Sequence, residues 1–228
     1  MPAVSFQASS MLASVPKNLA YSSEAIPFHL DLSYYESPPG IQFLHCRTFE
    51  AEGGDSTLMD AHAQAELFRA RHPEAFEALS RIPATFQKQR KEGDALQQAA
   101  AASMEYRRPH IDVNKRGEIL RVFWSPPFMG PLRVPAQDVE PYYKAIRAFE
   151  TFIEEDVGQL KISFRLEPGT AITFNQRRMW HGREAFSGGL RHLEGTYLNI
   201  DDFKSKVQWL NGVIGGNQTS WRAGNGAD

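Results

Sequence analysis

The sequence predicts a mainly β protein with flanking helices (α+β), folded as a double-stranded β-helix, or jelly roll. Short apolar runs bounded by turn residues dominate both ends of the 228-residue chain, whereas helical periodicity is confined to the middle. Histidine and carboxylate side chains occur in strand candidates of both ends, and the mouth of a jelly-roll barrel brings such groups together. A hydrophobic content of 42% suits one domain with a substantial core.

The predicted strands of the first half follow from local signals. Residues 41–46 and 57–59 are apolar runs, and the turn-forming Gly53-Gly54-Asp55 separates them. Further along, residues 111–113 and 118–124 flank a glycine-containing turn, which predicts a hairpin.

The helices are predicted around these strands. Asp60 can cap a helix that continues to residue 71, and Pro73 is tolerated in the first turn of a second helix that reaches residue 79. Residues 87–104 are polar and alanine-rich without an apolar stripe, which indicates an exposed, mobile insertion. Helical spacing then relates a set of apolar residues expected to pack on a sheet: Val139, Tyr142, Tyr143, Ile146, Phe149 and Ile153.

The last predicted strands lead to a histidine. Ile162, Phe164 and Leu166 alternate like a half-buried strand, and Pro168-Gly169 turns the chain into the apolar run that ends near His181.

Composition narrows the classes of function. The net charge is −2 and the basic residues are dispersed, so the sequence predicts neither a nucleic-acid partner nor an anionic membrane surface. The single cysteine, Cys46, excludes an internal disulfide and a thiolate zinc cluster, and is consistent with a reducing compartment. Without a secretory signal or an apolar stretch long enough for a bilayer, we expect an intracellular protein, cytoplasmic or mitochondrial.

Three side chains predict a metal site. His29 and Asp31 are two residues apart in a strand candidate, so both project to the same face, and His181 can supply a third ligand. Two histidines and one carboxylate with open positions form the arrangement of non-haem Fe(II) centres. The alternatives are a solvated polar strand edge and a hydrolytic zinc site. The remaining histidines are predicted to be structural or exposed: His45, His62, His72, His110 and His192.

Several sequence blocks in one order resemble a known family. They are Asn18-Leu19-Ala20-Tyr21, His29-Leu30-Asp31, Pro38-Pro39-Gly40-Ile41-Gln42-Phe43-Leu44-His45-Cys46, Gly53-Gly54-Asp55-Ser56, Trp180-His181-Gly182-Arg183 and Arg191-His192-Leu193-Glu194-Gly195-Thr196-Tyr197. Together they resemble the Fe(II)/2-oxoglutarate dioxygenases of the taurine-dioxygenase superfamily, in particular the γ-butyrobetaine and trimethyllysine hydroxylase branch. The resemblance runs from about residue 15 to residue 210. It implies a jelly-roll fold with His29, Asp31 and His181 as iron ligands.

The resemblance also implies residues for the cosubstrate. Arg191 matches the arginine that binds the far carboxylate of 2-oxoglutarate, a task that suits its planar, doubly donating guanidinium. Ser56, Asn18 and Leu44 match further positions of the cosubstrate pocket. Arg183 is a second candidate cation, interpreted as a neighbour that supports the site. An ordinary surface arginine and a turn-capping serine are the alternatives for Arg191 and Ser56.

For the substrate, the resemblance implies a small molecule, and its nearest branch acts on betaines in carnitine biosynthesis. Tyr21 and Tyr197 match two positions of the aromatic cage that holds a trimethylammonium group. Either can instead be a core tyrosine. The stretch that carries amides for the carboxylate of γ-butyrobetaine is Phe123-Trp124-Ser125-Pro126-Pro127 here, which lacks those amides and argues against that particular substrate.

The sequence predicts a flexible lead-in (1–16) and, from its glycine and asparagine content, a disordered tail (211–228). The resemblance implies a dioxygenase catalytic domain between them (17–210). Relatives carry a small N-terminal domain and several barrel strands before the Asn18 block, so we expect either a fragment or a shortened protein. An open barrel edge would favour a homodimer. The alternative to an enzyme is an inactive relative that serves as a binding or scaffold module.

Overall fold

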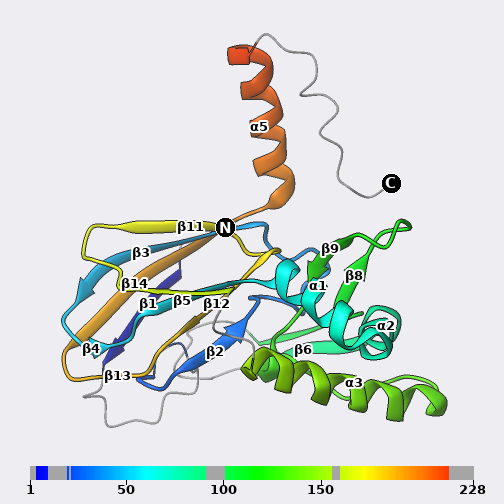
Figure 1. The fold of residues 1–228 in the computed structure, drawn as a ribbon. Coiled ribbons are helices and arrows are strands. Elements are labelled where there is room, and N and C mark those ends of the chain that lie inside the picture. Colours follow the sequence, from blue (N-terminus) through cyan, green and yellow to red (C-terminus); the bar gives the residue numbers. More distant parts are fainter. Residues whose placement is uncertain (1–3, 10–19, 21, 91–100, 156–159, 216–228) are drawn as a thin grey trace.

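The computed structural model describes residues 4–9, 20, 22–90, 101–155 and 160–215 (Figure 1). Two four-stranded antiparallel sheets form its β part, and three two-stranded sheets accompany them. The first sheet, in spatial order, contains β1 (Val4–Ser9), β14 (Leu190–Leu198), β3 (Ile41–Phe49) and β11 (Ala171–Asn175). The second contains β10 (Lys161–Phe164), β5 (Ser56–Asp60), β12 (Met179–Arg183) and β2 (Ile26–His29).

The two sheets pack on one another through a small apolar cluster. Cys46 of β3 and Leu193 of β14 are buried there, with Phe164 of β10 packed against them. In both sheets, strands from opposite ends of the chain are neighbours: β3 pairs with β14, and β5 pairs with β12. The jelly-roll prediction requires such pairing. A short two-stranded sheet, β4 (Glu52–Gly53) with β13 (Phe186–Ser187), also joins the two halves of the chain.

The first three α-helices along the chain gather at one end of the sheets (Figure 1). The elements of this region are α1 (Ala61–Arg71), α2 (Pro73–Arg81), β6 (Ala84–Arg90), β7 (Ala102–Arg108), β8 (Ile111–Val113), β9 (Ile119–Val122), the 3₁₀ turn η2 (Pro126–Phe128) and α3 (Ala136–Glu155). The predicted cap is confirmed, because Asp60 accepts the backbone N–H groups of His62 and Ala63 at 3.0 and 3.2 Å. The predicted hairpin of β8 and β9 is also confirmed.

An aromatic core connects this helical region to the second sheet. Phe149 of α3 packs against Phe68 of α1, Trp124 and Trp180, with ring centroids 4.8, 5.4 and 5.9 Å apart. Trp180 is fully buried in β12, and its indole N–H donates to the carbonyl of Val122 at 3.1 Å. Since His181 follows Trp180, the core fixes the strand that presents this histidine.

Four local expectations differ from the structure. Residues 4–9 of the expected lead-in form β1, which pairs with β14. The expected insertion 87–104 contains parts of the paired strands β6 and β7, with 91–100 outside the described residues. The expected tail begins inside α5 (Ile200–Gly215), which projects from the sheets in Figure 1. Val139 and Tyr143 of the predicted apolar stripe are 39% and 56% exposed.

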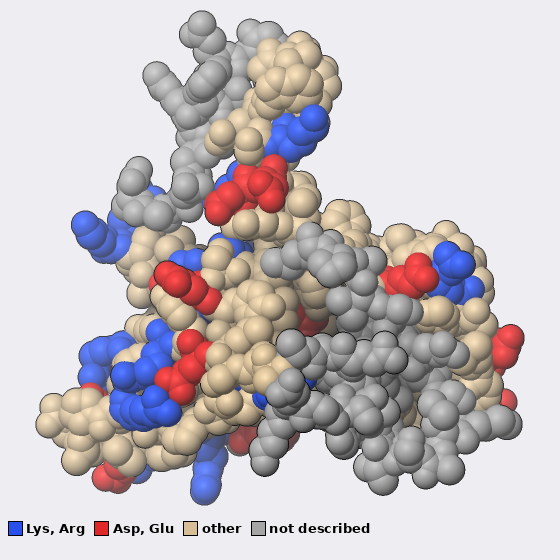
Figure 2. All heavy atoms as spheres, turned by 180° about the vertical axis from the view of Figure 1, so that it is seen from behind, with Lys and Arg blue, Asp and Glu red and all other residues tan. Residues whose placement is uncertain are grey.

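Surface features agree with the dispersed charge of the sequence. Basic and acidic side chains are intermingled on the face shown in Figure 2. Within the described part of the chain, no helix combines the length and apolarity required to cross a bilayer.

Candidate metal centre

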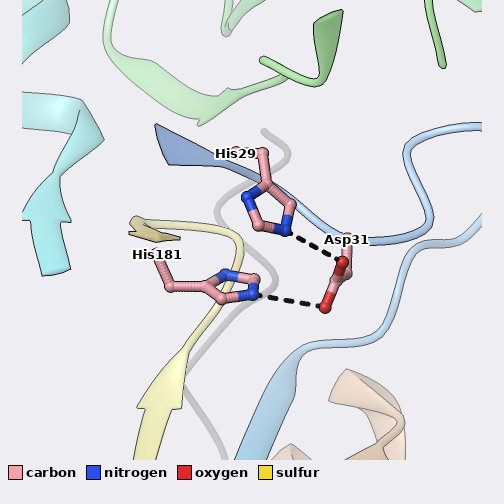
Figure 3. A group of neighbouring side chains, drawn as sticks. All are labelled: His29, Asp31 and His181. Atoms are coloured by element: carbon pink, nitrogen blue, oxygen red, sulfur yellow. Dashed lines mark ion pairs between the residues drawn. The ribbon is translucent and has the colours of Figure 1, made fainter. Parts of the chain in front are cut away.

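His29, Asp31 and His181 converge at one point (Figure 3). Ligand atoms of the three side chains all lie within 4.8 Å of one another. The Nε2 atoms of His29 and His181 lie 3.4 Å from Oδ1 and Oδ2 of Asp31, respectively, and the three side chains are only 12–21% exposed. The predicted triad is therefore assembled, and none of the other histidines joins a comparable group in the described ranges.

Strand pairing accounts for the two imidazoles. β12 pairs with β2 so that His181 is directly opposite His29, and the ring centroids are 4.2 Å apart. Gly182 allows β12 to approach β2 and β5 closely, because a Cβ there would meet the carbonyl oxygen of Ile26 at 2.6 Å and Thr57 Oγ1 at 2.8 Å. This contact explains the glycine that follows His181.

Asp31 reaches the site differently from the prediction. β2 ends at His29, so Asp31 lies in a turn rather than two residues along a strand, and Leu32 after it has φ of 56° in the left-handed region. The fully buried Gln176 holds this turn. Its Oε1 accepts the N–H of Asp31 at 3.2 Å, and its Nε2 donates to the carbonyl of Asp31 at 3.3 Å. Sequence reasoning missed Gln176, whose only signal was its proximity to His181.

The electrostatics of the triad favour an ionised carboxylate. Burial alone would raise the pKa of Asp31, but His181 and His29 hold it well below its usual value. Burial and the neighbouring His29 lower the pKa of His181. For His29, burial acts downward, but the hydrogen bond and charge of Asp31 outweigh it and raise the pKa. Asp31 is thus available as an anionic ligand beside two imidazoles.

The donor set fits a divalent metal. Nδ1 of His29 donates to the carbonyl of Pro27 at 2.9 Å, which leaves Nε2 unprotonated in the neutral ring and directed toward Asp31. Ligating histidines commonly fix their tautomer through such a backbone acceptor. Nδ1 of His181 is buried and lacks a partner among the described residues. Two nitrogens and one carboxylate with open positions match an Fe(II) centre.

A buried cation, the guanidinium of Arg191, lies on β14 of the first sheet, whereas the two histidines of the triad lie on strands of the second sheet. Arg191 is 5% exposed, donates from Nε to the carbonyl of Gly54 at 3.2 Å, and lies 3.5 Å from Ser56 Oγ through Nη2. In the described part of the chain it has no carboxylate within ion-pair distance. Burial lowers the pKa of Arg191 to about 10, and the charge of Arg183 acts in the same direction. Gly54, with φ of 76°, leaves room for this side chain.

The other predicted residues have distinct positions. Leu44 lies two residues after Gln42 on β3, so both project to the same face. Arg183 donates to the carbonyl of Ser22 at 2.7 Å, so it supports the segment before β2. Tyr197 donates its hydroxyl to Asp31 Oδ2 at 2.6 Å, and burial and the Asp31 charge raise its pKa well above 10.0. The predicted residues Asn18 and Tyr21 lie outside the described residues.

Comparison with known families agrees with this geometry. The family described as "Taurine catabolism dioxygenase TauD, TfdA family" matches residues 5–197. The chain belongs to the TauD/TfdA dioxygenase family. The family prediction is therefore confirmed.

Curated relatives include enzymes of two named kinds. The γ-butyrobetaine dioxygenase of Pseudomonas sp. (strain AK-1) is 33% identical over 82% of this chain and 47% of its own length. The trimethyllysine dioxygenase of Meyerozyma guilliermondii is 31% identical over 84% of this chain and 46% of its own. The human γ-butyrobetaine dioxygenase is 29% identical over 85% and 49%. The chain thus spans about half the length of the curated relatives it matches.

Solved structures share the fold. The non-heme iron oxygenase OrfP, in complex with Fe and alpha-ketoglutaric acid, has a TM-score of 0.56 at 14% identity, covering 90% of this chain and 59% of its own. Asparagine oxygenase, in complex with Fe(II), 2S,3S-3-hydroxyasparagine and succinate, has a TM-score of 0.54 at 15% identity, covering 79% and 51%. The jelly-roll prediction is confirmed.

Proposed function

We propose that this protein is an Fe(II)/2-oxoglutarate-dependent dioxygenase that hydroxylates a small molecule. The observation that supports it most directly is the convergence of His29, Asp31 and His181 within 4.8 Å, in a chain of the TauD/TfdA family. In this proposal the three residues hold Fe(II). A zinc hydrolase on the same ligands would leave the buried Arg191 without a role.

The cosubstrate would extend from the triad to Arg191. Gln42 and Leu44 share one face of β3 with Cys46, and Arg191 on the neighbouring strand β14 lies 5.1 Å from the ring centroid of Phe49 at the end of β3. Alternate residues along a strand are about 7 Å apart, so the interval from Gln42 to Leu44 has the length of a small dicarboxylate. Arg191 would bind the far carboxylate through two N–H groups, with Ser56 and Leu44 lining the pocket. Asn18 is proposed for the same pocket from the family resemblance alone.

The chemistry divides between the bound groups and the protein. When bound, Fe(II) and 2-oxoglutarate supply the oxidation of an unactivated carbon by dioxygen, with release of succinate and CO₂. The protein fixes the ligands, through Gln176 and the Pro27 carbonyl, before the reactants arrive. The Phe174 ring, 5.4 Å from His181, supplies an apolar surface beside the triad that limits access of water.

We propose a betaine-like substrate with a quaternary ammonium group. The named relatives support this class, and Tyr197 offers an aromatic ring beside the triad. Tyr21 is proposed as a second ring from the resemblance. The segment before η2 also borders the site, since the N–H of Leu30 donates to the carbonyl of Trp124 at 2.8 Å. In this segment the buried Ser125 offers one hydroxyl, whereas amide side chains would be needed to bind the carboxylate of γ-butyrobetaine. Trimethyllysine-like compounds are therefore the first to test.

The test is an anaerobic titration of the purified protein with Fe(II) and 2-oxoglutarate. We expect the weak visible charge-transfer band that forms when the keto acid chelates iron. Succinate should then form in air when trimethyllysine or γ-butyrobetaine is added. Absence of the band in folded protein would refute the proposal and would favour an inactive binding or scaffold module.

A further inference from the structure

Three side chains from neighbouring strands form one row beneath the triad. Gln42 on β3 is directly opposite Phe174 on β11 and directly opposite Tyr197 on β14. Residues opposite one another in an antiparallel pair project to the same face of the sheet. The three side chains therefore form a continuous row across β11, β3 and β14, on the face toward Asp31 and His181.

Each member of this row contacts a residue of the triad. Gln42 is 2% exposed, and its Nε2 donates to Asp31 Oδ2 at 3.0 Å. The Tyr197 hydroxyl donates to the same Oδ2 at 2.6 Å. The Phe174 ring centroid lies 5.4 Å from that of His181. Two donors thus converge on Oδ2, which also lies 3.4 Å from His181 Nε2. Among the described residues, Oδ1 is approached by His29 Nε2 alone, at 3.4 Å.

We propose that Gln42 and Tyr197 are positioning residues that occupy Oδ2 and so restrict Asp31 to one metal-binding oxygen, Oδ1. A carboxylate can bind a metal through one oxygen or both. An oxygen that already accepts two hydrogen bonds, one from a hydroxyl at 2.6 Å, is a poorer second ligand. This inference rests on the proposed function.

The restriction has a consequence for reactivity. Two imidazoles and a single carboxylate oxygen would hold a metal with positions left for the two oxygens of a chelating keto acid and for dioxygen. A carboxylate bound through both oxygens would take one of those positions. The row therefore preserves the open face of the site, and Tyr197 contributes through its hydroxyl independently of any contact between its ring and substrate.

The test compares Gln42→Met, which preserves side-chain size, with Tyr197→Phe, which keeps the ring. The measurements are anaerobic calorimetric titration with Fe(II) and the position of the charge-transfer band with 2-oxoglutarate. We expect Fe(II) affinity to fall about 10-fold in each variant, as is typical when a partner of a metal ligand is removed, and the band to shift. Gln89→Met and Tyr143→Phe, both at exposed positions, are the matched controls and should behave like the unaltered protein.

The outcomes separate this inference from the proposed function. If the unaltered protein forms the band and both variants retain its position and the Fe(II) affinity, the inference is overturned while the proposed function stands. A loss of thermal stability in the metal-free variants without any change in the band would indicate a structural role and would also overturn it. If the unaltered protein forms no band, both proposals fail.

Discussion

Histidine occurs in two contrasting settings in this molecule. His29 and His181 are partly exposed, and their Nε2 atoms approach the carboxylate of Asp31 at 3.4 Å. His110 is fully buried in the helical region. Its Nδ1 donates to the carbonyl of Phe123 at 2.7 Å, and its Nε2 accepts from the hydroxyl of Tyr142 at 3.1 Å.

The contrast shows what distinguishes a ligand from a core histidine. Both nitrogens of His110 are satisfied, and burial lowers its pKa to about 4, so it remains neutral and has no lone pair to offer. The Nε2 atoms of His29 and His181 both face the carboxylate of Asp31, and a divalent cation between the three groups would satisfy them together. The same residue type therefore serves packing in one region and is proposed to coordinate a metal in the other, and the following substitutions test that distinction.

The largest effect is expected on removal of a triad imidazole. His29→Ala should weaken Fe(II) binding more than about 100-fold, because a ligand is lost rather than one of its partners. Isothermal calorimetry under anaerobic conditions measures this. His45→Ala, at a position with a 38% exposed side chain, is the control and should bind iron normally. Unchanged affinity in His29→Ala would contradict the assigned site.

Removal of the buried cation should affect the cosubstrate alone. Arg191→Met should weaken 2-oxoglutarate binding about 100-fold while Fe(II) affinity is retained, since a buried charge pair loses one partner. Titration of the charge-transfer band with 2-oxoglutarate gives the affinity. The exposed Arg47→Met is the matched control. Equal 2-oxoglutarate affinity in both variants would assign the far carboxylate to another residue.

The core histidine should make stability depend on pH. Because its pKa is about 4 in the folded protein and 6.5 when unfolded, only the unfolded chain binds a proton between these values. The free energy of unfolding should therefore fall as pH drops from 6.5 toward 4, by about 2 kcal/mol between about pH 7 and about pH 5. Urea unfolding of His110→Gln should lack this component. An identical pH dependence in the variant would show that other groups cause it.

The smallest effect concerns the hydroxyl that satisfies His110. Tyr142→Phe leaves Nε2 of His110 without a donor and should lower the free energy of unfolding by about 1–2 kcal/mol. Its neighbour Tyr143 is 56% exposed, so Tyr143→Phe should change stability little. Chemical denaturation of both variants gives the comparison, and equal losses would argue against the His110–Tyr142 hydrogen bond.

Much of the fold follows from signals that lie within a few residues of one another. The cap at Asp60, the hairpin of β8 and β9 and the strand that begins at Ile41 were predictable, because turn chemistry, capping and alternation act locally. The errors fall where partners are distant. β1 forms because β14 offers an edge, and β6 and β7 form because each pairs with the other.

The candidate site likewise combines features that local sequence predicts with features that depend on distant partners. The sequence by itself determined the ligand types, since His29, Asp31 and His181 stand in blocks that resemble those of the family to which the chain belongs. Only the tertiary structure decided the direction of the carboxylate. Asp31 lies beyond its strand, and Gln176 and Tyr197, which are 145 and 166 residues away, hold it. Hydrogen bonds over such separations arise when the sheets pack, so no local pattern predicts them.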